Sequence, residues 1–350
     1  MARPSRLAIA IVPLAMFVSL QVLVSRADGV TIDLVTVGNP ANSADSTGFG
    51  GVAEVFDIGK YEVTNDQYAE FLNAVAKTDT HALYHTNMGA NYAGGITRTG
   101  SSGSYTYSVK DNMGDKPVNY VSFWDAARFA NWLHNGQPTG SQTAGTTEDG
   151  AYALGGVTAP DNSTITREPG AMYFLPSHDE WYKAAYHHPQ ADGGDSDDWW
   201  DYPTRSNDSP TPATADSVGN ISNPGENVVN FDKGAEWNDE EGNVTTVGSA
   251  GALSASYYGT FDQAGNIFEW TDTITGTQRI TRGGSWKFSW DLAASGAPAS
   301  LGPTGALDIF GFRVAAVHVP PAVVPEPRAA LLALIGGLIL WAYWRRRRSR

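Results

Sequence analysis

Cysteine is absent from the chain of 350 residues. Its absence excludes disulfides, thiolate metal sites, iron–sulfur clusters and every thiol nucleophile. Positive charge is also scarce, because 23 Lys and Arg residues stand against 37 Asp and Glu, a formal net charge of −14. Binding to nucleic acid needs a basic surface that displaces counterions from phosphates. We therefore predict no nucleic-acid partner.

Charged residues make up only 17% of the chain, whereas it contains 38 Gly and 19 Pro. Hydrophobic residues reach 41% and include 11 Trp, 15 Tyr and 13 Phe, which excludes a disordered chain. No internal repeat of fixed period is present, so the sequence does not favour a solenoid or a propeller. The composition predicts a globular α+β body with long connections.

Residues 1–27 have the features of a secretory signal peptide. Arg3 and Arg6 precede an apolar run over residues 7–24, and the small residues Ser25 and Ala27 suit signal peptidase. We predict cleavage after Ala27. The alternative is an uncleaved anchor helix, which the length of the run allows.

Residues 321–350 combine Val-Pro-Glu-Pro at 324–327, an apolar run over 329–344 and arginines at 345–348 and 350. This order resembles the PEP-CTERM sorting signal, which an exosortase recognises and removes in Gram-negative bacteria. The resemblance implies export across the inner membrane, anchoring through the C-terminal transmembrane helix until an exosortase-like enzyme acts, and a final place at the cell surface or outside the cell. The positive-inside rule keeps the arginines cytoplasmic and the body outside. An ordinary single-pass tail anchor is the alternative.

The body between these ends is strongly acidic. Residues 28–324 keep 14 basic and 36 acidic residues, a formal net charge of −22. Such a body suits a divalent cation or a basic partner. About 295 residues can bury roughly three quarters of their unfolded surface, so a single domain over residues 28–320 needs no disulfides.

Three segments begin with a hydroxyl residue followed three positions later by an acid or amide, the pattern of a helix capping box. We predict helices over residues 65–76, 123–134 and 178–187, capped by the pairs Thr64 and Gln67, Ser122 and Asp125, and Ser177 and Glu180. Short runs predict strands at 55–60, 171–175, 280–284 and 311–317. The polar stretches 139–161 and 189–225 are too long for simple turns, and such loops are usually functional or held by ions.

Six blocks occur in a fixed order over about residues 30–318. They are GKYEVTN at 59–65, PVNYVS at 117–122, LPSHDEW at 175–181, GNIFEW at 265–270, RGGSW at 282–286 and GFRVA at 311–315. Together they resemble the formylglycine-generating enzyme, or sulfatase-modifying factor, family. The resemblance implies a loop-rich, elaborated C-type-lectin-like α+β fold for residues 28–320.

Members of that family oxidise a sulfatase cysteine to formylglycine with two cysteines and copper. By resemblance, the two cysteine positions fall on Phe288 and Ala293. Neither side chain can bind Cu(I), and the hydroxyl of Ser289 lacks thiol redox chemistry. We expect no oxidase activity and no copper, and we expect Phe288 to pack into the pocket where oxidation would occur.

A second branch of the fold makes sulfoxides with histidine-bound iron. His81 and His85 would share a helix face if their segment were helical. No third ligand follows at motif spacing, so we interpret both as surface histidines.

The resemblance also implies Ca²⁺ sites built from oxygen ligands. The first would use the carboxylates of Asp262 and Glu269 with the carbonyls of Gly265 and Ile267. The alternative is that Glu269 caps a turn and Asp262 is solvated. A second site is implied at four further positions, Asn230, Phe231, Glu240 and Gly242.

Aromatic residues are dense where the family has its peptide groove, and we take Trp286, Trp290 and Phe310 as ligand-groove candidates. Aromatic rings can stack on sugars or hold peptide side chains, and they can equally serve packing. The sequence favours a catalytically silent, calcium-stabilised surface module that binds an envelope protein, a peptide or a glycan. The alternative is an oxidoreductase of the same fold that uses iron or copper with other ligands.

Overall fold

The computed structural model describes residues 29–320, 338, 341 and 344–348. The predicted signal peptide therefore lies outside the described residues, as does most of the predicted sorting tail. Within the described part, no helix is both long and apolar enough to cross a membrane. The α-helices are α1 (Asn65–Val75), α2 (Asn87–Ala90), α3 (Phe123–His134) and α4 (His178–Tyr186). Single turns of other helix types are η1 (Ala144–Glu148), η2 (Gln190–Asp192), η3 (Ala252–Ser254) and η4 (Trp290–Ala293).

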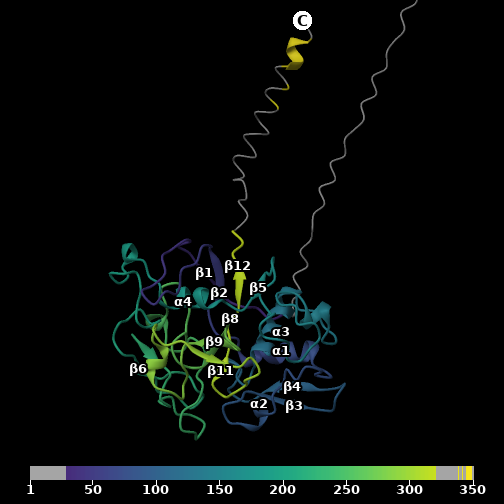
Figure 1. Cartoon of the computed structure of the whole chain (residues 1–350), viewed down its shortest axis with the longest axis vertical. Helices are drawn as coiled ribbons and strands as arrows, with labels where there is room; N and C mark the ends of the chain where they lie inside the picture. The colour runs from purple at the N-terminus through teal and green to yellow at the C-terminus, as the bar shows by residue number, and fades with distance from the viewer. Residues whose placement is uncertain (1–28, 321–337, 339–340, 342–343, 349–350) are drawn as a thin grey trace, which may run out of the picture.

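The strands are short and are separated by long irregular segments, as the composition predicted. They are β1 (Leu34–Val37), β2 (Phe56–Gly59), β3 (Ile96–Thr99), β4 (Thr106–Val109), β5 (Tyr173–Phe174), β6 (Thr211–Pro212), β7 (Val228–Val229), β8 (Phe268–Thr275), β9 (Gln278–Arg282), β10 (Ala299–Leu301), β11 (Phe310–Gly311) and β12 (Ala315–Val317). Figure 1 shows α1 and α3 on one side of the strands, with β6 on the other side and the hairpin β3–β4 near the foot of the molecule.

The three predicted helices are confirmed, and each begins at its predicted capping box. In every box the hydroxyl accepts from the backbone N–H three residues on, while the side chain at that position accepts from the backbone N–H of the cap. The helices α1 and α4 each end one residue before the predicted end, and Ala76 and His187 are their C-cap residues. Local sequence therefore determines where these helices start.

Two four-stranded sheets form the centre, in the orders β1-β2-β12-β5 and β10-β9-β8-β11. A single strand over residues 311–317 was predicted, and this is wrong. β11 pairs in parallel with β8, whereas β12 pairs antiparallel with both β2 and β5. Between them, Phe312 O accepts from Val63 N (2.9 Å) and Val314 O accepts from Gly59 N (2.7 Å). The chain crosses here from one sheet to the other, and Arg313 lies at the crossing.

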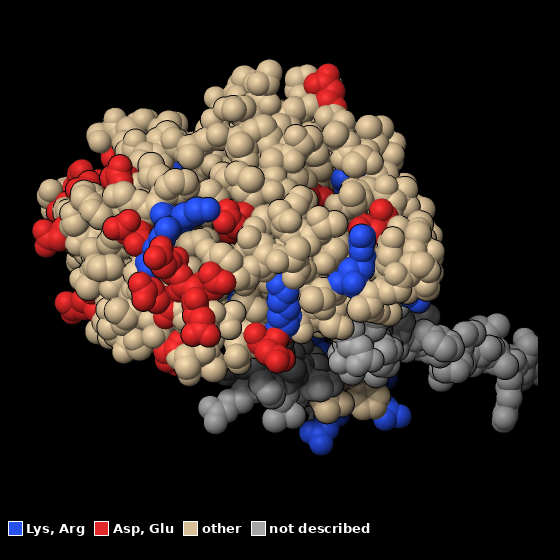
Figure 2. All heavy atoms as spheres, turned by 90° about the horizontal axis from the view of Figure 1, so that it is seen from below, with Lys and Arg blue, Asp and Glu red and all other residues tan. Residues whose placement is uncertain are grey.

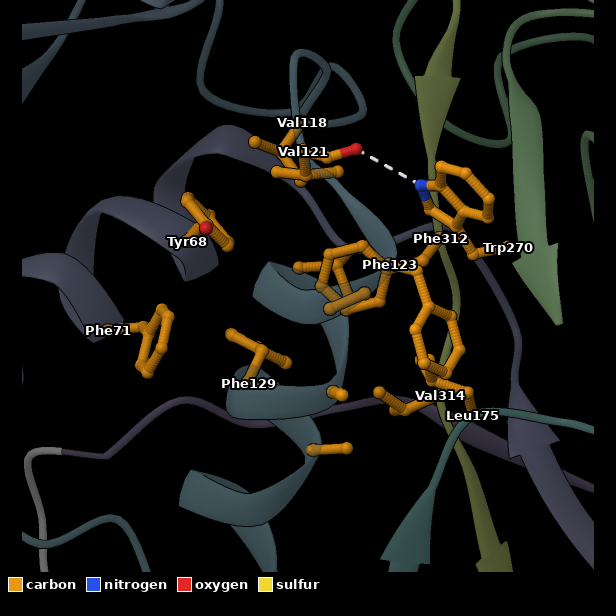
Figure 3. Close-up of a cluster of buried hydrophobic side chains, with 14 of the residues drawn as sticks. Tyr68, Phe71, Val118, Val121, Phe123, Phe129, Leu175, Trp270, Phe312 and Val314 are labelled. Carbon is orange, nitrogen blue, oxygen red and sulfur yellow. Dashed lines mark hydrogen bonds between the residues drawn. The ribbon is translucent and has the colours of Figure 1, made fainter. Parts of the chain in front are cut away.

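An aromatic core joins the helices to both sheets (Figure 3). The ring of Phe129 on α3 lies 5.3 Å from the rings of Phe71 on α1 and Phe312 at the sheet crossing. Trp270 on β8 is buried, and its Nε1–H donates to Val121 O (3.0 Å). Buried aromatic area of this kind stabilises a body of this size without disulfides.

The long loop 139–161 is held by side chains of α3. Arg128 donates through Nε and Nη2 to the two carboxylate oxygens of Glu148, at 2.7 and 2.8 Å. Its Nη2 also donates to Val157 O (2.9 Å), and Asn131 Nδ2 donates to Thr147 O (2.8 Å). The buried guanidinium of Arg128 therefore holds the loop 139–161 in place, a role for which a bound ion was one of the expectations.

Candidate functional site

The segment that follows β9 contains Phe288 and Ala293, the two positions to which the resemblance assigns the oxidase cysteines. Ala293 is buried, but the side chain of Phe288 is 42% exposed. The prediction that Phe288 packs into an oxidation pocket is therefore wrong. Trp286 points inward instead, because its N–H donates to Asn266 O (2.8 Å) and its carbonyl accepts from Lys233 N (2.7 Å). Two residues later the chain has turned, and Phe288 reaches the surface.

Only one of the three groove candidates is exposed. Trp286 and Phe310 are buried, whereas Trp290 is 36% exposed and its ring lies 6.0 Å from that of Tyr202. We call the exposed rings of Phe288 and Trp290 the Phe288–Trp290 surface. Behind it, the ring of Phe288 lies 6.3 Å from that of Phe268, which connects the surface to the core.

Charged residues of both signs lie beside the Phe288–Trp290 surface, because Lys233 and Lys287 are exposed there together with several carboxylates. Asp201, Asp232 and Asp291 are exposed, and Asp232 N donates to Phe288 O (2.8 Å). Acidic side chains are prominent on the face seen in Figure 2, where they gather on one side while much of the remainder of that face is uncharged. An exposed aromatic area on a strongly acidic body suits a partner that is neutral or basic.

Glu269, a predicted Ca²⁺ ligand, is engaged by two donors in the interior. Arg313 donates to both of its oxygens, through Nε and Nη2, each at 2.6 Å. Trp181 Nε1 donates to Oε2 at 2.7 Å, and all three side chains are fully buried. Burial opposes the charge of Arg313, yet the carboxylate raises the pKa of this guanidinium above its ordinary value. Glu269 is thus paired with a buried arginine, and its role as a Ca²⁺ ligand stays a prediction.

Arg313 brings four of the six sequence blocks together. Besides Glu269, it donates to Gly59 O (2.9 Å) and to Phe261 O (2.8 Å). Gly59 opens the first block, Trp181 closes the third, Glu269 belongs to the fourth and Arg313 to the sixth. Sequence reasoning missed this pairing. The signal in the sequence was one charged residue in each of two blocks, Glu269 in GNIFEW and Arg313 in GFRVA.

Asp262, the other predicted carboxylate ligand, has an acidic neighbour that sequence reasoning also missed. Asp262 is partly buried at φ 59°, and its carboxylate accepts from Gly248 N. Glu62 is 1% exposed; its Oε1 accepts from Asn266 Nδ2 (3.1 Å), while its Oε2 has no hydrogen-bond partner. Burial raises the pKa of Asp262 to about 6. Burial and then Asp262 raise the pKa of Glu62 well above its usual range.

Glu62 adds a buried carboxylate to the surroundings of Asp262. A buried carboxylate oxygen without a donor is an available ligand for a hard cation. Gly265 and Ile267 lie in the same loop between Asp262 and Glu269, where their carbonyls could contribute. In the part of the chain that the structure describes, no three or more acidic or histidine side chains are placed to hold a metal, so carbonyl or water oxygens would complete the shell.

The second predicted Ca²⁺ set is divided between the interior and the surface. Asn230 is buried, its Nδ2 donates to Asn243 O (2.9 Å) and its Oδ1 has no hydrogen-bond partner. Phe231 and Gly242 are also buried. Glu240 instead lines an open surface cavity of about 640 Å³ together with four other acids, Asp216, Glu236, Asp239 and Glu241.

The interpretation of His81 as a surface residue is wrong. His81 is buried, with Nε2 3.5 Å from Glu148 Oε2 and Nδ1 3.2 Å from Thr158 Oγ1. The long loop 139–161 covers it, a contact that local sequence does not reveal. His85 is partly exposed and stacks on Tyr120 at 5.4 Å. The segment between the two histidines is not helical, so they share no helix face.

His178, the first residue of α4, is buried against an arginine. Its Nε2 accepts from Arg282 Nε (2.7 Å), and Arg282 Nη1 donates to Ser295 O (2.7 Å). Burial, and then the charge of Arg282, lower the pKa of His178 to about 3. The imidazole is therefore neutral in the folded protein.

This shift predicts a loss of stability in acid. Below about pH 6.5, His178 binds a proton in the unfolded chain but not in the folded chain. The contribution of His178 to the free energy of unfolding therefore falls from pH 6.5 towards pH 3. Asp125 and Asp262 act in the opposite sense. Burial raises their pKa values, to about 7 and about 6, so the folded chain binds a proton at each more readily than the unfolded chain does, and acid favours folding there. We therefore expect the wild type to lose stability relative to His178→Gln between pH 7 and 5, by about 1–2 kcal/mol. Urea unfolding of both proteins at the two pH values measures it, and an unchanged difference would contradict it.

Comparison with solved structures finds chains of similar extent at low identity. Treponema denticola variable protein 1 is 18% identical, with 82% of this chain and 95% of that chain covered and a TM-score of 0.48. CarF is 20% identical, with 83% and 99% covered and a TM-score of 0.49. PvdO from Pseudomonas aeruginosa is 17% identical, with 82% and 92% covered and a TM-score of 0.40. Among curated proteins, none matches significantly.

The family comparison covers most of the body. Residues 50–317 match the sulfatase-modifying factor enzyme 1-like domain. The loop-rich α+β architecture agrees with the C-type-lectin-like fold expected of that domain. The chain therefore belongs to the sulfatase-modifying factor enzyme 1-like domain family.

Proposed function

We propose that the protein is an exported, non-catalytic binding module that engages its partner through the Phe288–Trp290 surface. The observation that carries this proposal is the exposed aromatic ring of Phe288 at the position of the first oxidase thiol. The second position, Ala293, is a buried methyl group. Neither residue can carry thiol or Cu(I) chemistry.

The surface suits recognition of a protein, a peptide or a glycan. Exposed aromatic rings provide contact area with little side-chain entropy to lose, and they stack on sugar rings or apolar side chains. The carboxylates of Asp201, Asp232 and Asp291 repel anionic partners. A neutral or basic envelope component is therefore the best match.

Export and anchoring belong to the same proposal. The signal peptide at 1–27 and the PEP-CTERM-like tail at 321–350 support passage across the inner membrane of a Gram-negative-type bacterium, followed by processing by an exosortase-like enzyme. Ca²⁺ is the proposed structural ion of the body.

Removing either ring is expected to weaken partner binding without unfolding the protein. The purified protein is screened on glycan and peptide arrays, and Phe288→Ser and Trp290→Ser are compared on whatever it binds. We expect each variant to lose at least about tenfold in affinity, since exposed aromatic residues are typical binding hot spots.

Leu253→Ser is the matched control, because Leu253 is 55% exposed in η3, outside the Phe288–Trp290 surface. It should bind like the wild type. Unchanged binding by both aromatic variants, at unchanged melting temperature, would contradict the proposed surface.

A second assay tests catalytic silence. The purified protein, given copper and a sulfatase-type peptide, should form no aldehyde, and formylglycine in the product would contradict the proposal. Metal analysis of protein purified without added metal addresses the alternative oxidoreductase, for which stoichiometric iron or copper is the expected result.

A further inference from the structure

We infer that the body, while its tail anchors it, contacts the lipid bilayer through the end of the sheet where β5 and β12 meet. The contact residues are Met172, Val317 and Val319, and we call them the Met172–Val319 surface. The inference rests on the anchoring part of the proposed function and adds the orientation that the anchored body takes. The partner is the interfacial region of a bilayer with zwitterionic headgroups.

Three apolar side chains are exposed together where the chain leaves the body. Met172 and Val317 are each 44% exposed, and Val319 is 66% exposed. β12 pairs with β5 in antiparallel register, with Ala316 opposite Tyr173, and Val317 N donates to Met172 O (3.1 Å). Because residues opposite one another on neighbouring strands share a face of the sheet, Met172 and Val317 lie side by side. Val319 follows two residues later.

The length of the tail limits which side of the body can face the bilayer. The described body ends at Pro320, and the apolar run of the predicted anchor begins at residue 329. The eight residues between them span at most about 29 Å when fully extended. A body of this size is roughly 50 Å across. The side opposite Pro320 therefore cannot reach the bilayer, whereas the Met172–Val319 surface lies next to the point of attachment.

The N-terminal end of the described body lies on the same side. Gly29, where the description begins, lines one surface cavity together with Tyr173 of β5 and Trp132 of α3. Figure 1 shows β12 and β5 at the top of the view and the hairpin β3–β4 near the foot. Gly29 and Pro320 are thus both close to β5 and β12, so the same side faces the membrane whether or not the signal peptide is still attached.

Apolar contact, and not charge, favours the bilayer as the partner of this surface. The net charge of −22 on the body repels anionic headgroups. Exposed aliphatic side chains gain free energy when they leave water, and the anchor holds them near the bilayer at high effective concentration. A weak contact by three side chains is therefore sufficient, and we expect it to weaken when anionic lipid replaces phosphatidylcholine.

Met172→Cys tests the inference, because the chain has no cysteine of its own and one new thiol can be labelled uniquely. The full chain, labelled there with a nitrobenzoxadiazole dye, is reconstituted into phosphatidylcholine vesicles with and without a nitroxide-bearing lipid. We expect the nitroxide to reduce the emission at least about twofold, since the dye would lie in the interfacial region. Adding Val317→Ser and Val319→Ser should reverse most of this quenching at unchanged melting temperature.

Ser102→Cys is the matched control, because Ser102 is exposed in the loop of the hairpin β3–β4, away from β5 and β12. Its label should be quenched clearly less. Equal quenching at the two positions would overturn the inference. Protection of the Met172 label that depends on protein concentration instead of lipid would also overturn it, because a second copy would then cover the surface.

Flotation of the same vesicles separates the inference from the proposal on which it rests. A full chain that does not float with the vesicles would contradict the proposed anchoring and the inference together. A chain that floats while its Met172 label stays unquenched would contradict the inference alone.

Discussion

Arg313→Met is expected to lower the free energy of unfolding by about 3–5 kcal/mol, the usual cost of removing one partner from a buried ion pair. The loss would leave Glu269 fully buried with Trp181 Nε1 as its only remaining donor among its present contacts. It would also remove the donors to Gly59 O and Phe261 O. Urea denaturation monitored by tryptophan fluorescence measures the change.

The double variant Arg313→Met/Glu269→Leu distinguishes the buried charge from lost packing. We expect it to be more stable than Arg313→Met alone, because removing both charges avoids an unpaired carboxylate. A cost below about 1 kcal/mol for Arg313→Met would show that water or another donor reaches Glu269, and the role assigned to the pair would be wrong.

Arg128→Met is expected to have an effect of similar size, about 3–5 kcal/mol, because Glu148 would become a buried carboxylate without its guanidinium. The loop 139–161 also loses its bond to Val157 O. Hydrogen exchange in that loop should therefore accelerate more than exchange elsewhere. Denaturant unfolding and hydrogen-exchange mass spectrometry measure the two effects.

Lys233→Met is the matched control. Lys233 also pairs with a carboxylate, that of Glu241 at 3.6 Å, but Lys233 is 47% exposed and Glu241 is 87% exposed. Water can solvate the remaining carboxylate there, so we expect a clearly smaller loss. Equal losses for Arg128→Met and Lys233→Met would mean that burial is not what makes Arg128 important.

The sequence was informative where structure is local. The capping boxes at Thr64, Ser122 and Ser177 depend on contacts three residues apart, and each helix begins where it was expected. The ordered blocks indicated the fold family, and the match over residues 50–317 confirms it. Helix starts and family membership could thus be predicted without coordinates.

The sequence failed where position depends on distant segments. The strand over 311–317 divides because its two halves pair with β8 in one sheet and with β2 and β5 in the other. His81 is buried by a loop that begins almost sixty residues later. Phe288 is exposed because the inward position next to it belongs to Trp286. The pair of Glu269 and Arg313 joins residues 44 apart, and periodicity gives no sign of such a contact.

The place of β12 has a consequence for the order of folding. This strand comes almost last in the body, yet it lies between β2 and β5 inside the first sheet. That sheet cannot close, and Arg313 cannot reach Gly59 254 residues earlier, until nearly the whole body has been synthesised. Contacts of such sequence separation make folding slow. The body therefore acquires its full stability only when its C-terminal end arrives.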